Sequence, residues 1–200
     1  MTPDRKLCVY CGSSEGENPA YMAAAGKLGK DLARAGIGLV YGGGSLGLMG
    51  AVARACRDAG GHVTGIIPEF LIREEIMLEG VSELIVTANM HERKMAMFEA
   101  SSGFCALPGG IGTLEELVEV ATWAQLGQHV KPIILANIEG YWSPLLELIG
   151  HMRAQGFFKS STEAKFDAVD KAAQIVPMFE KRLKIRRKPD WTPDMFEKRM

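Results

Sequence analysis

The chain has 200 residues, of which 47% are apolar and 24% charged, and its formal net charge is −1. This length suffices for one well-buried α/β domain, and the composition excludes disorder as the main state. The balanced charge gives no sign of nucleic-acid binding, and the N-terminus has no signal-peptide pattern. Because no apolar stretch reaches about 18 residues, we expect no membrane segment and a cytoplasmic location.

Short apolar or β-branched segments alternate with longer segments of helical period, a pattern typical of βαβ units. Strands are predicted over Lys6–Cys11, Ile37–Tyr41, His62–Ile67, Glu83–Thr87, Phe104–Leu107 and Lys131–Ala136, with a weaker one over Lys165–Val169. Helices are predicted over Tyr21–Ala35, Leu48–Ala59, Met90–Ser101, Thr113–Leu126, Trp142–Ala154 and Ala172–Leu183. We therefore expect one doubly wound, Rossmann-like α/β domain over residues 1–183, with a mainly parallel sheet of about seven strands. A charged tail is expected over residues 184–200.

Cys8 and Cys11 form a C-x-x-C pair within the first predicted strand. A thioredoxin-type dithiol stands at a helix N-terminus, and a zinc site needs two further ligands. Cys56 and Cys105 are isolated, and the histidines lack the spacing of a metal site. We therefore interpret the thiols as strand-packing groups and expect neither a metal nor a cofactor.

Three predicted strands run into turns rich in glycine or serine: Cys11–Ser14, Gly42–Gly47 and Pro108–Thr113. Glycine lets the backbone approach an anion closely, and a following helix offers unpaired N–H groups and the positive end of its dipole. In doubly wound folds, ligands bind beyond the carboxyl ends of the strands. The turns therefore predict a phosphate site with candidate contacts at Ser14, Gly43, Gly44, Gly109, Gly110, Ile111, Gly112 and Thr113.

The turn Gly42–Gly47 also matches the dinucleotide fingerprint G-x-G-x-x-G, with Glu69 after the next strand. That fingerprint usually occupies the first strand–helix turn, and this interpretation leaves the turn Pro108–Thr113 without a role. A nicotinamide-dependent oxidoreductase is therefore an alternative. A protein that binds a nucleotide without turnover is another.

Two charged residues fall on apolar faces of predicted helices. On Thr113–Leu126 the apolar residues cover more than half of the circumference, and Glu116 lies inside this arc. On Met90–Ser101, Arg93 falls on the small-residue face that should pack inward. A carboxylate in such a position is costly unless it is paired or functional. Arg93 and Glu116 are therefore either a buried structural pair or a catalytic set beside the turns.

The segments Met90–Lys94 (MHERK) and Pro108–Glu116 (PGGIGTLEE) resemble the signature of the LOG ("lonely guy") family, P-G-G-x-G-T-x-x-E. The resemblance extends over roughly residues 6–157 and includes Gly47–Gly50 and Thr122–Gly127. It implies hydrolysis of the N-glycosidic bond of a cytokinin or adenosine nucleoside 5′-monophosphate to free base and ribose 5-phosphate. Relatives carry the older label lysine decarboxylase, but no lysine context for pyridoxal phosphate is recognisable here.

The resemblance also assigns roles to individual residues. It implies Arg93 and Glu116 as the catalytic pair. It implies substrate contacts at Glu75, Lys94, Gly110, Ile111, Gly112, Thr113 and Thr122. Glu74 is the alternative counterpart of Glu75, because Arg73-Glu74-Glu75 stands where the family usually has Pro-Arg-Glu.

The proposed cleavage passes through an oxocarbenium-like state. A carboxylate near the anomeric carbon would stabilise its positive charge or orient the attacking water, and a cation would offset the charge on the departing base.

The wide apolar arc of the helix Thr113–Leu126 predicts a homodimer, or a higher oligomer, with this helix at or beside the interface. Leaving Val120 and Trp123 in water would expose more apolar surface than a soluble monomer usually does.

Overall fold

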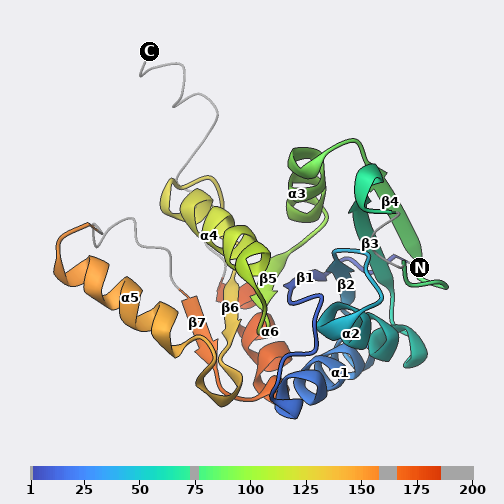
Figure 1. Ribbon diagram of the computed structural model, residues 1–200, viewed down its shortest axis with the longest axis horizontal. Coiled ribbons are helices and arrows are strands. Elements are labelled where there is room, and N and C mark those ends of the chain that lie inside the picture. Colours follow the sequence, from blue (N-terminus) through green and yellow to red (C-terminus); the bar gives the residue numbers. More distant parts are fainter. Residues whose placement is uncertain (1, 73–76, 158–165, 186–200) are drawn as a thin grey trace.

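Seven strands, all parallel, form one sheet in the order β4-β3-β2-β1-β5-β6-β7 (Figure 1). The structure is a computed structural model, and it describes residues 2–72, 77–157 and 166–185. The strands are β1 (Lys6–Tyr10), β2 (Gly38–Tyr41), β3 (Val63–Pro68), β4 (Glu83–Thr87), β5 (Gly103–Ala106), β6 (Ile133–Ala136) and β7 (Phe166–Val169).

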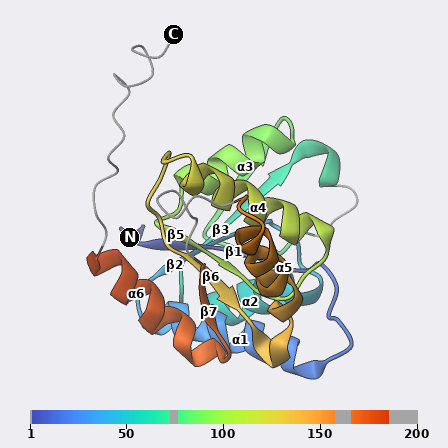
Figure 2. The same ribbon diagram turned by 90° about the vertical axis from the view of Figure 1, so that its left-hand side faces the viewer.

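Helices cover both faces of this sheet (Figure 2). On one face pack α1 (Pro19–Arg34), α2 (Gly47–Asp58) and α6 (Ile175–Ile185); on the other pack α3 (Met90–Glu99), α4 (Ile111–Gln125) and α5 (Ser143–Ala154). Short 3₁₀ segments are η1 (Glu69–Leu71), η2 (Ile138–Gly140) and η3 (Ala172–Gln174). Along β1, Leu7 and Val9 join one buried cluster, whereas Cys8 and Tyr10 join the other. This alternation with a period of two is why a central strand needs apolar residues at every position.

The direction of strand order reverses between β1 and β5. The chain builds β1 to β4 outward to one edge, returns to the other side of β1 with β5, and then continues to β7 (Figure 1). The connections that follow β1 and β5 therefore run to opposite faces and leave a crevice at the carboxyl ends of the strands. Across this crevice the Gly12 N–H donates to the Pro108 carbonyl at 3.0 Å.

The predicted fold class is confirmed, and the helix bounds differ by a few residues. The helix predicted from Thr113 begins at Ile111, because Gly110 adopts the extended backbone of an N-cap. The segment predicted as one helix from Ala172 is η3 followed by α6. The expected tail over 184–200 lies outside the described residues except for Lys184 and Ile185, which end α6.

The predicted homodimer rested on the expectation that Val120 and Trp123 of α4 would be exposed in a monomer. The packing within the chain corrects that expectation. Val120 is only 2% exposed and belongs to the buried cluster on this side of the sheet. Trp123 is partly buried against the Phe98 ring, with the ring centroids 5.0 Å apart. The exposed apolar side chains of α4 are instead Ile111 and Val118, and Leu126 directly after the helix is exposed as well.

All four cysteines are free and buried, as the strand-packing interpretation requires. Cys8 and Cys11 belong to clusters on opposite faces of the sheet, so they do not form a dithiol. Burial raises the pKa of Cys56 to about 11, which keeps this thiol protonated. Within the described ranges no group of His, Cys, Asp or Glu could hold a metal ion, and no helix is long and apolar enough to cross a membrane.

Candidate active site

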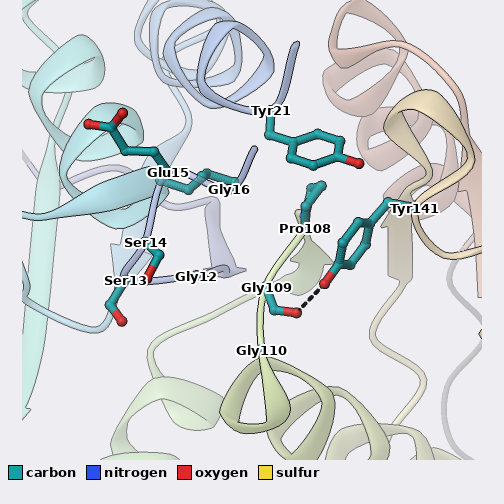
Figure 3. A pocket seen from close by; sticks show the side chains of 11 residues that line it. Gly12, Ser13, Ser14, Glu15, Gly16, Tyr21, Pro108, Gly109, Gly110 and Tyr141 are labelled. Atoms are coloured by element: carbon teal, nitrogen blue, oxygen red, sulfur yellow. Dashed lines mark hydrogen bonds between the residues drawn. The ribbon is translucent and has the colours of Figure 1, made fainter. Parts of the chain in front are cut away.

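Two adjoining cavities lie at the crevice between the ends of β1 and β5. The first, the Tyr141 cavity, has a volume of about 290 Å³ and is lined by the turns Gly12–Gly16 and Pro108–Gly110 with Tyr21 and Tyr141 (Figure 3). The second, the Arg93 cavity, has a volume of about 220 Å³ and is lined by both predicted catalytic residues, together with Cys11, Met49, Met90 and Thr113. Gly12, Ser13 and Gly110 line both cavities, so the two meet at these residues.

Arg93 comes from the first turn of α3 and is only 7% exposed. Its Nη2 donates to the Gly42 carbonyl at 3.4 Å, and its buried Nε has no hydrogen-bond partner among the described residues. The described part of the chain contains no ion pair between Arg93 and Glu116. A buried guanidinium with an unused N–H group is costly unless a ligand accepts from it. The arrangement therefore favours the catalytic interpretation over a structural pair.

Glu116 comes from α4, is partly buried and lines the Arg93 cavity. Burial raises the pKa of its carboxyl group from 4.5 to about 7, although the nearby positive charge of Arg93 acts in the opposite direction. A carboxyl group with this pKa can hold or release a proton near neutral pH. A perturbed carboxyl group in a cavity is also a recognised indication of a functional site.

The N-terminus of α4 faces the junction of the two cavities with unpaired donors. Gly110 caps the helix without a side-chain hydrogen bond, and the first turn contains no acidic residue. In the described structure the N–H groups of Gly110, Ile111 and Gly112 have no backbone acceptor. A Cβ atom at Gly110 or Gly112 would meet nothing within 4 Å. An anion can therefore approach these donors directly.

The Gly42–Gly47 turn has a different environment. Gly43 and Gly47 have positive φ values of 85° and 53°, and a Cβ atom at Gly47 would collide with the backbone of Ser13. The carbonyl of Gly43 accepts from the N–H of Leu78 at 3.4 Å, and Gly44 pairs with Met77. Gly43 and Gly44 line neither of the two cavities. The turn thus supports the walls of the site, and substrate contact by its glycines stays a prediction.

The remaining predicted contacts are dispersed. Ser14 lines the Tyr141 cavity. Lys94 donates to Glu115 at 2.7 Å and to Glu119 at 2.9 Å, and these hydrogen bonds raise its pKa. Thr122 is exposed, and its hydroxyl group donates to the carbonyl one turn before it in α4 at 2.8 Å. The structure thus brings neither Lys94 nor Thr122 into the two cavities. Glu74 and Glu75 lie outside the described residues.

Several lining or supporting residues were missing from the predicted site, among them Gly42, Met49, Met90 and Tyr141. A Cβ atom at Gly42 would collide with the Arg93 guanidinium, so glycine here leaves room for that side chain. Met49 and Met90 flank the same guanidinium. Tyr141 follows the carboxyl end of β6, and its position in the sequence after that strand is the signal that could have identified it.

Comparison with known proteins shows the family to which the chain belongs. Residues 49–179 match the family model described as "Possible lysine decarboxylase". The cytokinin riboside 5′-monophosphate phosphoribohydrolase LOG3 of Arabidopsis thaliana is 47% identical over 176 residues, which cover 88% of this chain and 82% of that protein. The phosphoribohydrolase LOG of Oryza sativa is also 47% identical, over 88% of this chain and 73% of its own length. This chain belongs to the LOG family. The resemblance inferred from its two signature segments is thereby confirmed.

Solved structures extend the comparison to the fold of this LOG family member. The Moco carrier protein of Chlamydomonas reinhardtii superposes with a TM-score of 0.69 over 91% of this chain and 99% of its own, at 22% identity. The molybdenum cofactor binding protein of Rippkaea orientalis gives a TM-score of 0.67 over 90% and 98% of the two chains, also at 22% identity. At this identity the likeness concerns the fold alone.

Proposed function

We propose that this LOG family chain hydrolyses the N-glycosidic bond of a nucleoside 5′-monophosphate, releasing the free base and ribose 5-phosphate. The observation that carries the proposal is that Arg93 and Glu116 line one cavity whose edge is the uncapped N-terminus of α4. The names of the relatives identify a cytokinin riboside 5′-monophosphate as the substrate to test first. Neither an oxidoreductase nor a non-catalytic nucleotide binder has comparable support.

In the proposed complex the 5′-phosphate accepts from the backbone N–H groups at the start of α4, from Gly110 to Thr113. This contact holds the ribose in the Arg93 cavity, so that remote binding energy positions the anomeric carbon beside Glu116. The carboxylate stabilises the oxocarbenium-like state or orients the water that adds to the anomeric carbon. As the glycosidic bond breaks, its electron pair leaves with the base, and Arg93 offsets that negative charge. The water that adds to the anomeric carbon loses a proton, and the departing base gains one.

We propose further that the chain forms at least a homodimer through the side of the sheet that carries α4. This side exposes the apolar side chains of Val118 on α4, of Leu126 directly after α4, and of Leu148 and Met152 on α5. Burying them against a second copy would remove apolar surface from water. Light scattering at micromolar concentration tests this, and a mass near 22 kDa would contradict it. The cytoplasmic location stays a prediction.

The proposed reaction is tested by incubating the purified protein with adenosine 5′-monophosphate and with N6-isopentenyladenosine 5′-monophosphate and measuring the free base by chromatography. We expect release of base from at least one of them and none from the Glu116→Gln variant. Absence of base from both at high enzyme concentration would contradict the proposal. Calorimetric binding of the monophosphate without release would instead identify a non-catalytic nucleotide binder.

A further inference from the structure

The peptide group between Gly109 and Gly110 is held by a side chain from a distant part of the chain. The Gly109 carbonyl accepts from the Tyr141 hydroxyl group at 2.5 Å (Figure 3). The carbonyls on either side, those of Pro108 and Gly110, accept from backbone N–H groups of the β1 turn at 3.0 Å and of α4 at 3.1 Å. All three carbonyl oxygens of this turn are therefore occupied by the chain itself, and the groups left free are N–H donors.

The hydrogen bond to Tyr141 fixes the direction of the next N–H group. The described residues contain no cis peptide bond, and in a trans peptide the carbonyl and the following N–H point in opposite directions. With its carbonyl turned toward Tyr141, this peptide points the N–H of Gly110 to the opposite side, where Figure 3 shows Ser13 and Ser14. That side is the junction of the two cavities, to which Gly110 and Ser13 both contribute.

A peptide group flanked by two glycines needs such a restraint. Glycine populates positive and negative φ about equally, so Gly110 can change φ with little steric resistance, whereas Gly109 is packed against Thr113 and Gly12. Around Gly110 the surroundings add none, since a Cβ atom there would meet nothing within 4 Å. The flipped peptide would present a carbonyl oxygen to an incoming phosphate in place of an N–H group, which converts attraction into repulsion.

The Tyr141 ring is itself held in place. It makes edge-to-face contacts with Tyr21 and Trp142, with ring centroids 5.4 Å and 5.0 Å apart. Trp142 is buried and donates to the Ala106 carbonyl at the end of β5 at 3.2 Å. Just before the ring, Glu139 has a φ of 52°, a backbone strain of the kind that concentrates at functional positions. The hydroxyl group is thus fixed relative to the same strand that carries the Pro108–Gly110 turn.

We propose that Tyr141 is a positioning residue for phosphate recognition: its hydroxyl group keeps the Gly109–Gly110 peptide with its N–H toward the substrate phosphate. The inference rests on the proposed function and adds a residue that determines how strongly the enzyme prefers a 5′-phosphate. Tyr141 itself takes no part in bond cleavage. Its removal should therefore affect the monophosphate and spare the nucleoside.

The test compares Tyr141→Phe with the wild type on adenosine 5′-monophosphate and on adenosine. Phenylalanine keeps the ring and its contacts and removes only the hydroxyl group. We expect kcat/KM for the monophosphate to fall about 10-fold, a change typical of losing one hydrogen bond, while kcat/KM for adenosine stays unchanged. The inhibition constant of ribose 5-phosphate should rise by a similar factor. The melting curve of Tyr141→Phe should match that of the wild type, which separates loss of the hydrogen bond from loss of the fold.

A purely structural role for Tyr141 would lower the rates on both substrates together, and that result would overturn the proposal. An unchanged ratio of the two kcat/KM values would overturn it as well. If the wild type releases no base at all, the proposed function fails, but the role of Tyr141 is still decided by calorimetry with ribose 5-phosphate. Binding must then weaken in Tyr141→Phe; binding equal to that of the wild type would contradict the inference.

Discussion

Two glycine-rich turns at the same edge of the sheet differ in how much of their glycine content packing requires. Gly109 is packed like Gly42 and Gly47, since a Cβ atom there would collide with Thr113 Oγ1, but Gly110 is not. In the Gly42–Gly47 turn, a Cβ atom would collide with the protein itself: with the guanidinium of Arg93 at Gly42 and with the Ser13 backbone at Gly47. In the Pro108–Thr113 turn, Gly110 has nothing within 4 Å of where its Cβ would stand. The first turn needs glycine to fold, whereas at Gly110 the fold does not need it.

The difference shows how a packing glycine can be distinguished from a ligand glycine. Both turns follow a parallel strand and open a helix, so composition and spacing treat them alike. Where a glycine lines a cavity and neither backbone strain nor packing requires it, a ligand that must come close to the backbone explains it. By this criterion we propose that the phosphate binds at the Pro108–Thr113 turn, whereas Gly42 of the other turn leaves room for the Arg93 guanidinium.

The largest effect on the reaction rate is expected from a substitution of Glu116 on α4, the helix that follows the Pro108–Thr113 turn. Glu116→Gln keeps the size of the side chain and removes its charge, so kcat should fall by about 100-fold or more while the fold survives. Steady-state kinetics combined with a melting curve measures both quantities. A near-wild-type rate would mean that Glu116 has a structural role only.

Gly110→Val tests the Pro108–Thr113 turn, where the position of a Cβ atom at Gly110 is free of protein atoms. The added side chain meets no protein atom within the reach of its Cβ, so the melting temperature should change little. It would block the approach of the phosphate to the backbone, and kcat/KM for the monophosphate should fall by about 10- to 100-fold, the range for hydrogen bonds to a charged group. A lower melting temperature with an unchanged kcat/KM would mean that Gly110 is required for packing and not for phosphate binding.

Gly47→Ala tests the Gly42–Gly47 turn, where the surrounding protein leaves no room for a Cβ atom at Gly47. The positive φ of 53° and the collision with Ser13 should lower the free energy of unfolding by about 2 kcal/mol or more. Gly26→Ala in α1 is the matched control, since a Cβ there meets nothing and alanine favours a helix by about 0.5–1 kcal/mol. Denaturant unfolding measures both variants. Equal stability of Gly47→Ala and the wild type would break the comparison.

The raised pKa of Glu116 predicts that kcat depends on pH near neutrality. If the carboxylate is the active form, kcat should rise about 10-fold from pH 6 to pH 8, because the pKa is about 7. Stability follows the opposite sign: the folded state holds this proton more tightly than the unfolded state. The stabilisation is complete below about pH 4.5 and lost by about pH 7. A pH–rate profile with no inflection between pH 6 and 8 would contradict the assignment.

The fold and the inward positions of Arg93 and Glu116 could be predicted from the sequence because both follow from regular periods. The catalytic role of the two residues is implied by the family resemblance and stays a prediction. Alternating strand and helix patterns fix a doubly wound sheet, and a period of 3.6 residues is enough to show Glu116 and Arg93 on apolar faces. Contacts formed across loops leave no such pattern. The hydrogen bond from Tyr141 to Gly109 joins residues 32 positions apart in sequence, and only the fold brings them together.

Contacts between distant parts of the chain also decide which way the Gly42–Gly47 turn packs and which side chains cover α4. Glycine spacing predicted that Gly43 and Gly44 face the ligand, but spacing carries no information on which way a turn packs. Helical periodicity likewise shows that α4 has a wide apolar arc but not what covers it. The covering groups for Trp123 include Phe98 of α3, a contact between two helices that the sequence does not pair.

The central claim is that a phosphate at the N-terminus of α4 positions the ribose beside Arg93 and Glu116. The most direct test is to compare kcat and KM of the wild type for adenosine 5′-monophosphate and for adenosine, with release of adenine as the readout. The account predicts that the nucleoside loses kcat and not only affinity, since the phosphate contact aligns the reacting carbon. Comparable kcat/KM values for the two substrates would contradict it.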